Sequence, residues 1–263
     1  MNEIIINNPG SELIQSVQTA LLDDTDPDTN FSFYTFNDVP VPRVTKILDK
    51  VINKPGLLYW AANIGRKNMY IEQKKAVTIG TKVHLLIENF LKGINKYPDM
   101  SDVHPADIKT IKTSYTNFVD WITNLVETGN TFELIATELK VVCPLYGGTI
   151  DCIARINGAN YIIDWKTSKS INTEYYIQAA AYMWAINNGY CKEVDHIDGI
   201  GIVRLPKNAY GYEESFLTYN NPVHAKYIDD YIRAFGSLLQ AYYNLVHIEQ
   251  FEHHYSIQQL LEE

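Results

Sequence analysis

Apolar residues follow two different periods along the 263-residue chain, and the change comes near Gly129. Before this point they recur every three or four positions, which is typical of helices that bury one face. We expect helices at 11–22, 56–64, 66–75, 79–92 and 105–127, another helix that begins near Arg43, and a short strand at 31–36. The polar run at 23–30 is typical of a turn or a mobile linker.

After Gly129, short apolar runs rich in β-branched residues are typical of strands. We expect strands at 132–143, 147–156, 161–168, 199–206 and 214–219, with helices at 174–187 and 223–246. Asn157 and Gly158 favour a tight turn between the second and third strands, so these two strands are expected to be antiparallel neighbours. The order of elements predicts an α/β fold, with a mixed central sheet flanked by helices and a helical N-terminal lobe.

A single domain accounts for most of the chain in this interpretation, because domains commonly contain roughly 100–200 residues or more. Residues 1–30 are interpreted as an N-terminal extension and residues 31–263 as the domain. Within the domain we expect a helical lobe at 31–128, a catalytic sheet core at 129–220 and a C-terminal helix at 221–263.

The composition is that of a globular protein, with 46% hydrophobic and 12% aromatic residues. No apolar run approaches the roughly 18 residues of a membrane span, so we expect no membrane contact. The N-terminal residues lack the features of a secretory signal, which favours the cytoplasm. Cys143, Cys152 and Cys191 form no CxxC motif, so we expect reduced thiols that behave as small hydrophobic groups.

Charge is distributed unevenly along the chain. The net charge of −9, taken alone, argues against a nucleic-acid partner. Residues 41–82, however, carry nine Lys and Arg residues against two acids, whereas residues 1–40 carry seven acids and no base. A polyanion responds to the patch on which it docks, so the basic segment 41–82 keeps a nucleic-acid partner open.

Two neighbouring strands each carry a carboxylate among apolar residues, at Asp151 and at Asp164. Side chains alternate along a strand, so Asp164 and Lys166 project to one side while Ile163 and Trp165 project to the other. Pairing of the two strands would bring Asp151 close to Asp164. Two carboxylates with an ammonium ion beside them indicate a divalent-metal site with a charge stabiliser. The alternative is a pair of solvated carboxylates.

Short motifs in a fixed order extend this interpretation. They are VPRVTKIL at 41–48, GTKVH at 80–84, GTID at 148–151, IDWKT at 163–167 and QAAAY at 178–182. Their order resembles that of the PD-(D/E)XK nuclease superfamily, and within it the RecB-type exonucleases and the mitochondrial genome maintenance exonuclease. Arg43 departs from the serine usual in this group. The resemblance implies a restriction-endonuclease-like fold in a stand-alone enzyme of a bacterial or phage-infected cell.

The resemblance also implies a set of metal ligands. Asp151 and Asp164 supply carboxylates, Trp165 supplies its main-chain carbonyl, and His84 supplies an imidazole that would otherwise be interpreted as a packed helical histidine. Hard oxygen ligands suit Mg²⁺ or Mn²⁺, and one imidazole favours Mn²⁺ somewhat. Zinc fits less well, because His84 has no second His or Cys nearby in sequence. Glu88, four residues further along, is expected to hold the imidazole ring.

Further side chains complete the predicted site. Lys166 is expected to orient the attacking water or to stabilise charge on phosphorus, unless it merely neutralises the carboxylates. Glu138 matches the acidic residue that these nucleases carry ahead of the first catalytic Asp, although a solvated strand glutamate is the alternative. Gln178 and Tyr182, with Tyr175, share one stripe of a helix and are expected to contact DNA; the alternative is that this stripe only packs into the core. A buried Gln needs partners, so we expect Gln178 to contact the lysine or a DNA phosphate.

The basic segment 41–82 also contains aromatic residues, a combination that suits a single strand held by charge and base stacking. The alternative is a solvated helical surface with core aromatics. The expected DNA contacts are Arg66, Lys67, Lys74, Lys75 and Trp60. Some RecB relatives carry an iron–sulfur cluster on four cysteines, and since this chain has three cysteines we expect no cluster.

These residues predict a metal-dependent deoxyribonuclease, and in the first place an exonuclease on single-stranded DNA or duplex ends in replication, recombination or repair. A helicase or recombinase partner would come from another chain, since no helicase motif is present. One alternative is a structure- or sequence-specific endonuclease of the same fold. The other is a non-catalytic module that binds nucleic acid or protein, against which the presence of Asp151, Asp164 and Lys166 argues.

Overall fold

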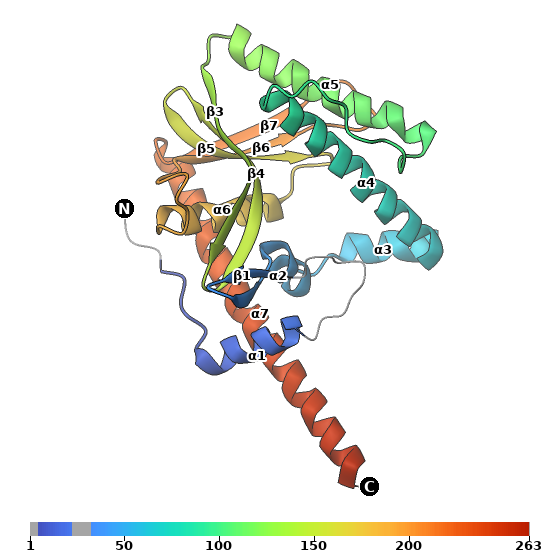
Figure 1. Cartoon of the computed structure of the whole chain (residues 1–263), viewed down its shortest axis with the longest axis vertical. Helices are drawn as coiled ribbons and strands as arrows, with labels where there is room; N and C mark the ends of the chain where they lie inside the picture. Colours follow the sequence, from blue (N-terminus) through green and yellow to red (C-terminus); the bar gives the residue numbers. More distant parts are fainter. Residues whose placement is uncertain (1–4, 23–32, 263) are drawn as a thin grey trace.

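A five-stranded mixed sheet forms the centre of the molecule, and helices cover both of its faces (Figure 1). The computed structural model describes residues 5–22 and 33–262. The strands lie in the order β3 (Phe132–Cys143), β4 (Tyr146–Ile156), β5 (Ala159–Lys166), β6 (Gly199–Arg204) and β7 (Glu213–Thr218). β5 and β6 are parallel, and the other neighbouring pairs are antiparallel. The predicted mixed α/β architecture is therefore confirmed.

The β4–β5 hairpin turns at Asn157 and Gly158, as predicted. Their φ angles are 51° and 85°, which is the pair of left-handed conformations that a type I′ turn requires. The ladder continues from Ile156 opposite Ala159 to Cys152 opposite Ile163. α6 (Thr173–Asn187) then connects β5 to its parallel neighbour β6.

Two apolar clusters hold the helices on the sheet. One cluster joins α1 (Ser11–Leu22), α2 (Val44–Val51), α6 and α7 (Pro222–Glu262) to one face, and the other joins α4 (Arg66–Leu91) and α5 (Pro105–Glu127) to the opposite face. Strand alternation explains the division, because Ile162 belongs to the first cluster and its neighbour Ile163 to the second. Trp165, two positions after Ile163, lies on the same face and packs edge-on against Trp121, with ring centroids 5.3 Å apart.

Two smaller units flank the sheet. The hairpin of β1 (Phe33–Phe36) and β2 (Val39–Pro42) lies against the start of β4, where Tyr34 packs over Gly147. α3 (Pro55–Ile64) buries none of its residues and extends from the body together with the first turns of α4 (Figure 1). We call α3 and the first half of α4 the helical arm.

Several predicted boundaries are wrong. The helices expected at 66–75 and 79–92 form the single helix α4, because residues 76–78 contain no proline and no capping motif that would end a helix. α7 continues to Glu262, well past residue 246. β2 was not expected as a strand. The linker predicted at 23–30 lies outside the described residues, and the division into lobes stays a prediction.

Cys143 and Cys152 are buried as small core residues, and Cys191 is half-buried. Within residues 5–22 and 33–262, no helix has the length and apolar character that crossing a bilayer requires.

Candidate active site

A cleft of about 380 Å³ lies between α4, the sheet and the middle of α6. Residues from six segments of the chain line it, which explains why no single motif defines the site. The predicted site residues that line this cleft are His84, Glu138, Asp151, Gln178 and Tyr182. The aromatic and hydroxyl side chains of Tyr34 and Thr149 line it as well.

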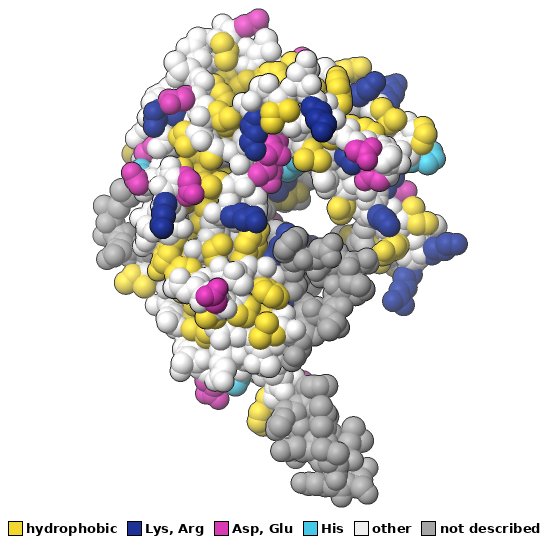
Figure 2. Space-filling model, in the orientation of Figure 1, with side chains coloured by type: hydrophobic (Ala, Val, Ile, Leu, Met, Phe, Trp, Pro, Cys, Tyr) yellow, Lys and Arg dark blue, Asp and Glu magenta, His cyan; other side chains and the backbone are white. Residues whose placement is uncertain are grey.

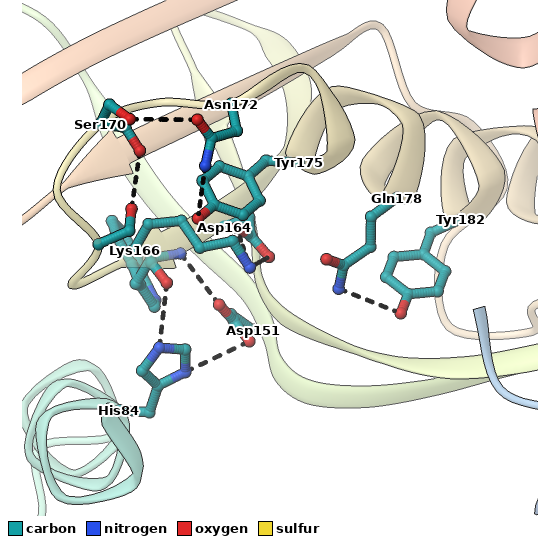
Figure 3. A network of polar contacts seen from close by, with 11 residues as sticks. His84, Asp151, Asp164, Lys166, Ser170, Asn172, Tyr175, Gln178 and Tyr182 are labelled. Carbon is teal, nitrogen blue, oxygen red and sulfur yellow. Dashed lines mark hydrogen bonds and ion pairs between the residues drawn. The ribbon is translucent and has the colours of Figure 1, made fainter. Parts of the chain in front are cut away.

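His84 reaches the sheet from α4. Ile79, Val83 and Leu86 are buried on the sheet side of this helix, which fixes its rotation and brings the imidazole over β4 and β5. His84 Nδ1 lies 3.4 Å from Asp151 Oδ1, and Nε2 lies 3.0 Å from the carbonyl oxygen of Trp165 (Figure 3). Burial opposes the charged ring, but the nearby Asp151 carboxylate outweighs burial and raises the pKa of His84 to about 9.

Asp151 lies at the point where β4 and β5 separate. Their main-chain ladder ends at Cys152 and Ile163, and the next main-chain N–H, of Trp165, donates a 2.9 Å hydrogen bond to Asp151 Oδ2 instead. The carboxylate thus replaces a strand partner and is held between the strands. Burial opposes its charge, yet His84, Lys166 and the Trp165 N–H together lower the pKa of Asp151.

Asp164 is one of the few buried charged residues, with 6% of its surface exposed. Lys166 Nζ donates to Oδ1 at 3.0 Å and lies 2.8 Å from Oδ2, which is nevertheless buried without a hydrogen bond of acceptable geometry. Burial raises the pKa of Asp164 to about 6, against the opposing effect of Lys166. Burial also opposes the charge of Lys166, but the carboxylates of Asp164 and Asp151 raise its pKa.

Glu138 adds a further carboxylate from β3, on the other side of β4. It lies between Thr137 and Leu139, which pair with Cys152 and Ile150, so the register places it opposite Asp151. Its φ angle of 50° is left-handed, an uncommon conformation for a residue with a side chain inside a strand. Although Glu138 is exposed at the cleft surface, desolvation and then the charge of Asp151 raise the pKa of its carboxyl.

The donor atoms fit a divalent metal ion. One donor atom each from His84, Glu138 and Asp151 lies within 4.8 Å of the other two. Asp164 lies on the neighbouring strand and contributes a buried carboxylate whose Oδ2 contacts Lys166 but accepts no well-aligned hydrogen bond. Several carboxylates with a single imidazole match the ligand preferences of Mg²⁺ and Mn²⁺ better than those of zinc.

Gln178 and Tyr182 form the α6 wall of the cleft (Figure 3). Gln178 Nε2 donates to the Tyr182 hydroxyl at 3.3 Å, so the predicted contact between Gln178 and the lysine is not formed. The Tyr182 ring packs directly against Gly148, where even a methyl group would collide with it. The QAAAY motif therefore determines how closely α6 approaches the start of β4.

The predicted pair between His84 and Glu88 is wrong. Both ring nitrogens of His84 already face Asp151 and Trp165, and Glu88 instead forms a 2.5 Å ion pair with Lys92. Glu88 still lines the cleft.

Of the predicted DNA contacts, Gln178 and Tyr182 line the cleft. The others lie on the helical arm, since Trp60 belongs to α3 and the basic residues to α4. Lys75 forms a 2.8 Å ion pair with Asp107 of α5. Figure 2 shows Lys and Arg side chains together with hydrophobic ones on this arm, and the molecule is hollowed between the arm and the sheet. Tyr59 and Tyr70 are 75% and 54% exposed there.

Two cleft residues were missed by the sequence analysis. The Tyr34 hydroxyl lies 2.7 Å from Thr149 Oγ1, and both side chains line the cleft. Tyr34 lies outside every motif, so only the packing of the β1–β2 hairpin on β4 reveals it. Thr149 lies inside the GTID motif, and its hydroxyl was a signal that could have been used.

Comparison with known proteins supports the same interpretation. No curated protein matches the chain. The family model of the PD-(D/E)XK nuclease superfamily matches residues 56–253, a range that includes His84, Glu138, both strand carboxylates and the QAAAY helix. Since this match spans most of the chain and coincides with a restriction-endonuclease-like sheet, the chain belongs to the PD-(D/E)XK nuclease superfamily.

Proposed function

We propose that this nuclease is a metal-dependent deoxyribonuclease of the RecB type, an exonuclease that acts on single-stranded DNA or duplex ends. One observation carries the proposal: His84, Glu138 and Asp151 converge in the cleft, and the Asp164–Lys166 ion pair lies on β5, the strand next to that of Asp151. Carboxylates and one imidazole form a donor set that suits a metal ion for phosphodiester hydrolysis, and the lysine adds a positive charge beside it.

In this proposal Asp151, Asp164, His84 and the Trp165 carbonyl hold Mg²⁺ or Mn²⁺, and Glu138 assists. Such an ion supplies Lewis acidity toward the phosphate and lowers the pKa of a water molecule. Mn²⁺ is the better match because His84 offers a nitrogen donor. The Trp165 carbonyl oxygen lies 3.0 Å from His84 Nε2, so these two proposed ligand atoms are already close to each other.

Lys166 acts on the reacting phosphate. Its ammonium group is held at Asp164 and carries a positive charge, which can orient the attacking water or stabilise the charge that develops on the phosphate oxygens. The position of Lys166 in a partly buried site strengthens this interaction, because solvent screening is reduced there. Metal-assisted activation of water leaves Lys166 free of a role as general base.

The α6 wall positions the substrate. Gln178 donates one amide hydrogen to Tyr182 and has a second one that can bind a phosphate oxygen in the cleft. Tyr182 fixes the amide group, so the donor is already oriented when the strand arrives.

The helical arm carries the incoming strand. Arg66, Lys67, Lys74 and Lys75 supply positive charge, and Trp60, with exposed Tyr59 and Tyr70 nearby, supplies stacking surfaces for bases. Replacement of the four basic residues by Ala is expected to reduce the salt dependence of DNA binding. An unchanged salt dependence would contradict this path.

The process is proposed to be replication, recombination or repair in the cytoplasm of a bacterial or phage-infected cell. A helicase or recombinase from another chain would supply the strand. The proposed process and the proposed partner both rest on the resemblance of the motifs to those of RecB-type enzymes.

The decisive experiment is a nuclease assay with Mn²⁺ or Mg²⁺ that compares the wild type with Asp164→Ala and Lys166→Ala. We expect both variants to lose activity by about a thousandfold or more, while Asp120→Ala, an exposed aspartate on α5, retains it. Equal residual activity in the wild type and in Asp164→Ala would support a non-catalytic binding module instead.

A second substrate separates exonuclease from endonuclease. Linear single-stranded DNA is expected to be degraded, and a circular single strand of the same sequence is expected to be resistant. Cleavage of the circle would favour the structure- or sequence-specific endonuclease of the same fold.

A further inference from the structure

The ammonium group of Lys166 contacts an aromatic ring as well as Asp164. Lys166 Nζ lies 4.6 Å from the centroid of the Tyr175 ring, within the range of a cation–π interaction. Figure 3 shows Tyr175 beside the lysine, on the first turn of α6 and on the same side of this helix as Gln178 and Tyr182.

The loop after β5 holds the Tyr175 ring by its hydroxyl end. Asn172 Nδ2 lies 3.4 Å from the Tyr175 hydroxyl and can donate to it, and the Asn172 carbonyl accepts the Tyr175 N–H at 3.1 Å. Ser170 Oγ donates to Asn172 Oδ1 at 3.1 Å, and Ser168 Oγ donates to the Ser170 carbonyl at 2.8 Å. The ring is therefore attached to the helix at one end and to the loop at the other.

A lysine needs such support because its ammonium group sits on a flexible stem of four carbons. Asp164 holds it in an ion pair, but the same carboxylate belongs to the proposed metal site. An aromatic ring restrains the ammonium group without donating to it or neutralising it, so the positive charge stays available to a phosphate.

We propose that Tyr175 is a positioning residue that holds the Lys166 ammonium group in place for phosphodiester hydrolysis. The inference rests on the proposed function, because it assigns Lys166 to the reacting phosphate. It predicts that the π face of residue 175 matters and that the hydroxyl group is secondary.

Three variants separate these contributions. Tyr175→Phe keeps the ring and removes the hydroxyl, Tyr175→Leu removes the ring, and Tyr176→Leu is the matched control. Tyr176 is the adjacent ring on α6, packs against the same core cluster, and stacks on Tyr231 with centroids 5.2 Å apart. Melting temperatures of all three show whether each variant is folded.

We expect Tyr175→Leu to lower kcat on linear single-stranded DNA by about tenfold with little change in KM, as for loss of a cation–π contact in a partly desolvated site. Tyr175→Phe should remain within about twofold of the wild type, and Tyr176→Leu should leave kcat unchanged even if its melting temperature falls. A Phe variant as impaired as the Leu variant, or a Leu variant that alters only KM, would overturn the inference.

A second measurement needs neither metal nor DNA. In the metal-free protein with labelled lysine, the Hε signals of Lys166 should be shifted upfield by the ring current in the wild type and in Tyr175→Phe. They should return to the range of the other lysines in Tyr175→Leu. An unshifted Lys166 in the wild type would overturn the inference while leaving the nuclease proposal intact. A wild type that is inactive on DNA would overturn the proposed function, and with it the catalytic part of this inference, even if the shift is present.

Discussion

His84 on α4 and Asp151 on β4 form an ion pair in which Nδ1 lies 3.4 Å from Oδ1. The other ring nitrogen faces the Trp165 carbonyl at 3.0 Å, so both nitrogens meet oxygen acceptors. This environment suits a doubly protonated ring and agrees with the raised pKa of about 9. A metal ion needs the neutral imidazole, so a proton and a metal ion compete for His84.

The first prediction is that Mn²⁺ affinity rises with pH. Below a pKa of about 9 the metal-free ring is protonated, so binding must release its proton. We expect the Kd for Mn²⁺ to fall by about tenfold per pH unit between roughly pH 6.5 and 8.5. Isothermal titration calorimetry in buffers of different ionisation enthalpy measures both the affinity and the released proton.

His84→Asn serves as the control for this titration. It should bind Mn²⁺ more weakly and with a flatter pH dependence, because the titrating ring is gone while Asp151 remains. A Kd for the wild type that is the same at pH 6.5 and pH 8.5 would exclude His84 as a ligand that must lose a proton.

The second prediction concerns two glycines of the motifs that behave oppositely. A methyl group at Gly148 would collide with the Tyr182 ring, whereas at Gly80 its nearest neighbour is Thr167 Oγ1 at 3.8 Å, an ordinary contact. Gly148→Ala should therefore lower the free energy of unfolding by about 1–3 kcal/mol. Gly80→Ala, inside α4, should raise it by about 0.5–1 kcal/mol.

Urea unfolding of the two variants tests this pair of glycines. Tolerance of Gly148→Ala without loss of stability would mean that α6 does not approach β4 as closely as the Tyr182 contact requires.

Local sequence patterns were sufficient to predict those features of the structure that neighbouring residues determine. The Asn157–Gly158 turn can adopt left-handed conformations at both positions, so it determined the β4–β5 register. Strand alternation then put Asp164 and Lys166 on one side, where they form their ion pair. The order of the motifs supplied the fold, because the strands that carry them are neighbours in the sheet.

Other features depend on packing that the sequence pattern does not contain. The Tyr34–Thr149 contact joins a distant hairpin to β4, and Lys75 meets Asp107 on another helix. The orientation of His84 followed neither from its spacing to Glu88 nor from helix propensity. It is decided by the buried face of α4 and by the gap between β4 and β5.

The third prediction uses the left-handed backbone of Glu138, whose φ angle is 50°. This conformation costs roughly 1–2 kcal/mol for a residue with a Cβ and nothing for glycine. Glu138→Gly should therefore be more stable than Glu138→Ala by about 1 kcal/mol, while both lose nuclease activity. Thermal or urea unfolding of the two variants measures the difference.

Glu133 on the same strand provides the control for Glu138, since it pairs in register with Arg155 and has no left-handed φ angle. There the order should reverse, and Glu133→Gly should be less stable than Glu133→Ala by about 0.5–1 kcal/mol. The same order of stability at both positions would mean that Glu138 is not strained.

The last prediction compares two adjacent lysines of the helical arm. Lys75 is paired with Asp107 at 2.8 Å, whereas Lys74 makes no ion pair with any residue in the described part of the chain. If the arm carries a single strand, Lys74→Ala should reduce the slope of log K against log salt by about 0.7, the value for one phosphate contact. Lys75→Ala should change this slope less and should lower the melting temperature more, because it leaves the buried Asp107 carboxylate without its partner.

Fluorescence anisotropy with a labelled oligonucleotide, in Ca²⁺ to prevent cleavage, measures the slopes. Equal slopes for Lys74→Ala and the wild type would place the strand elsewhere, and a larger effect of Lys75→Ala would mean that DNA displaces Asp107.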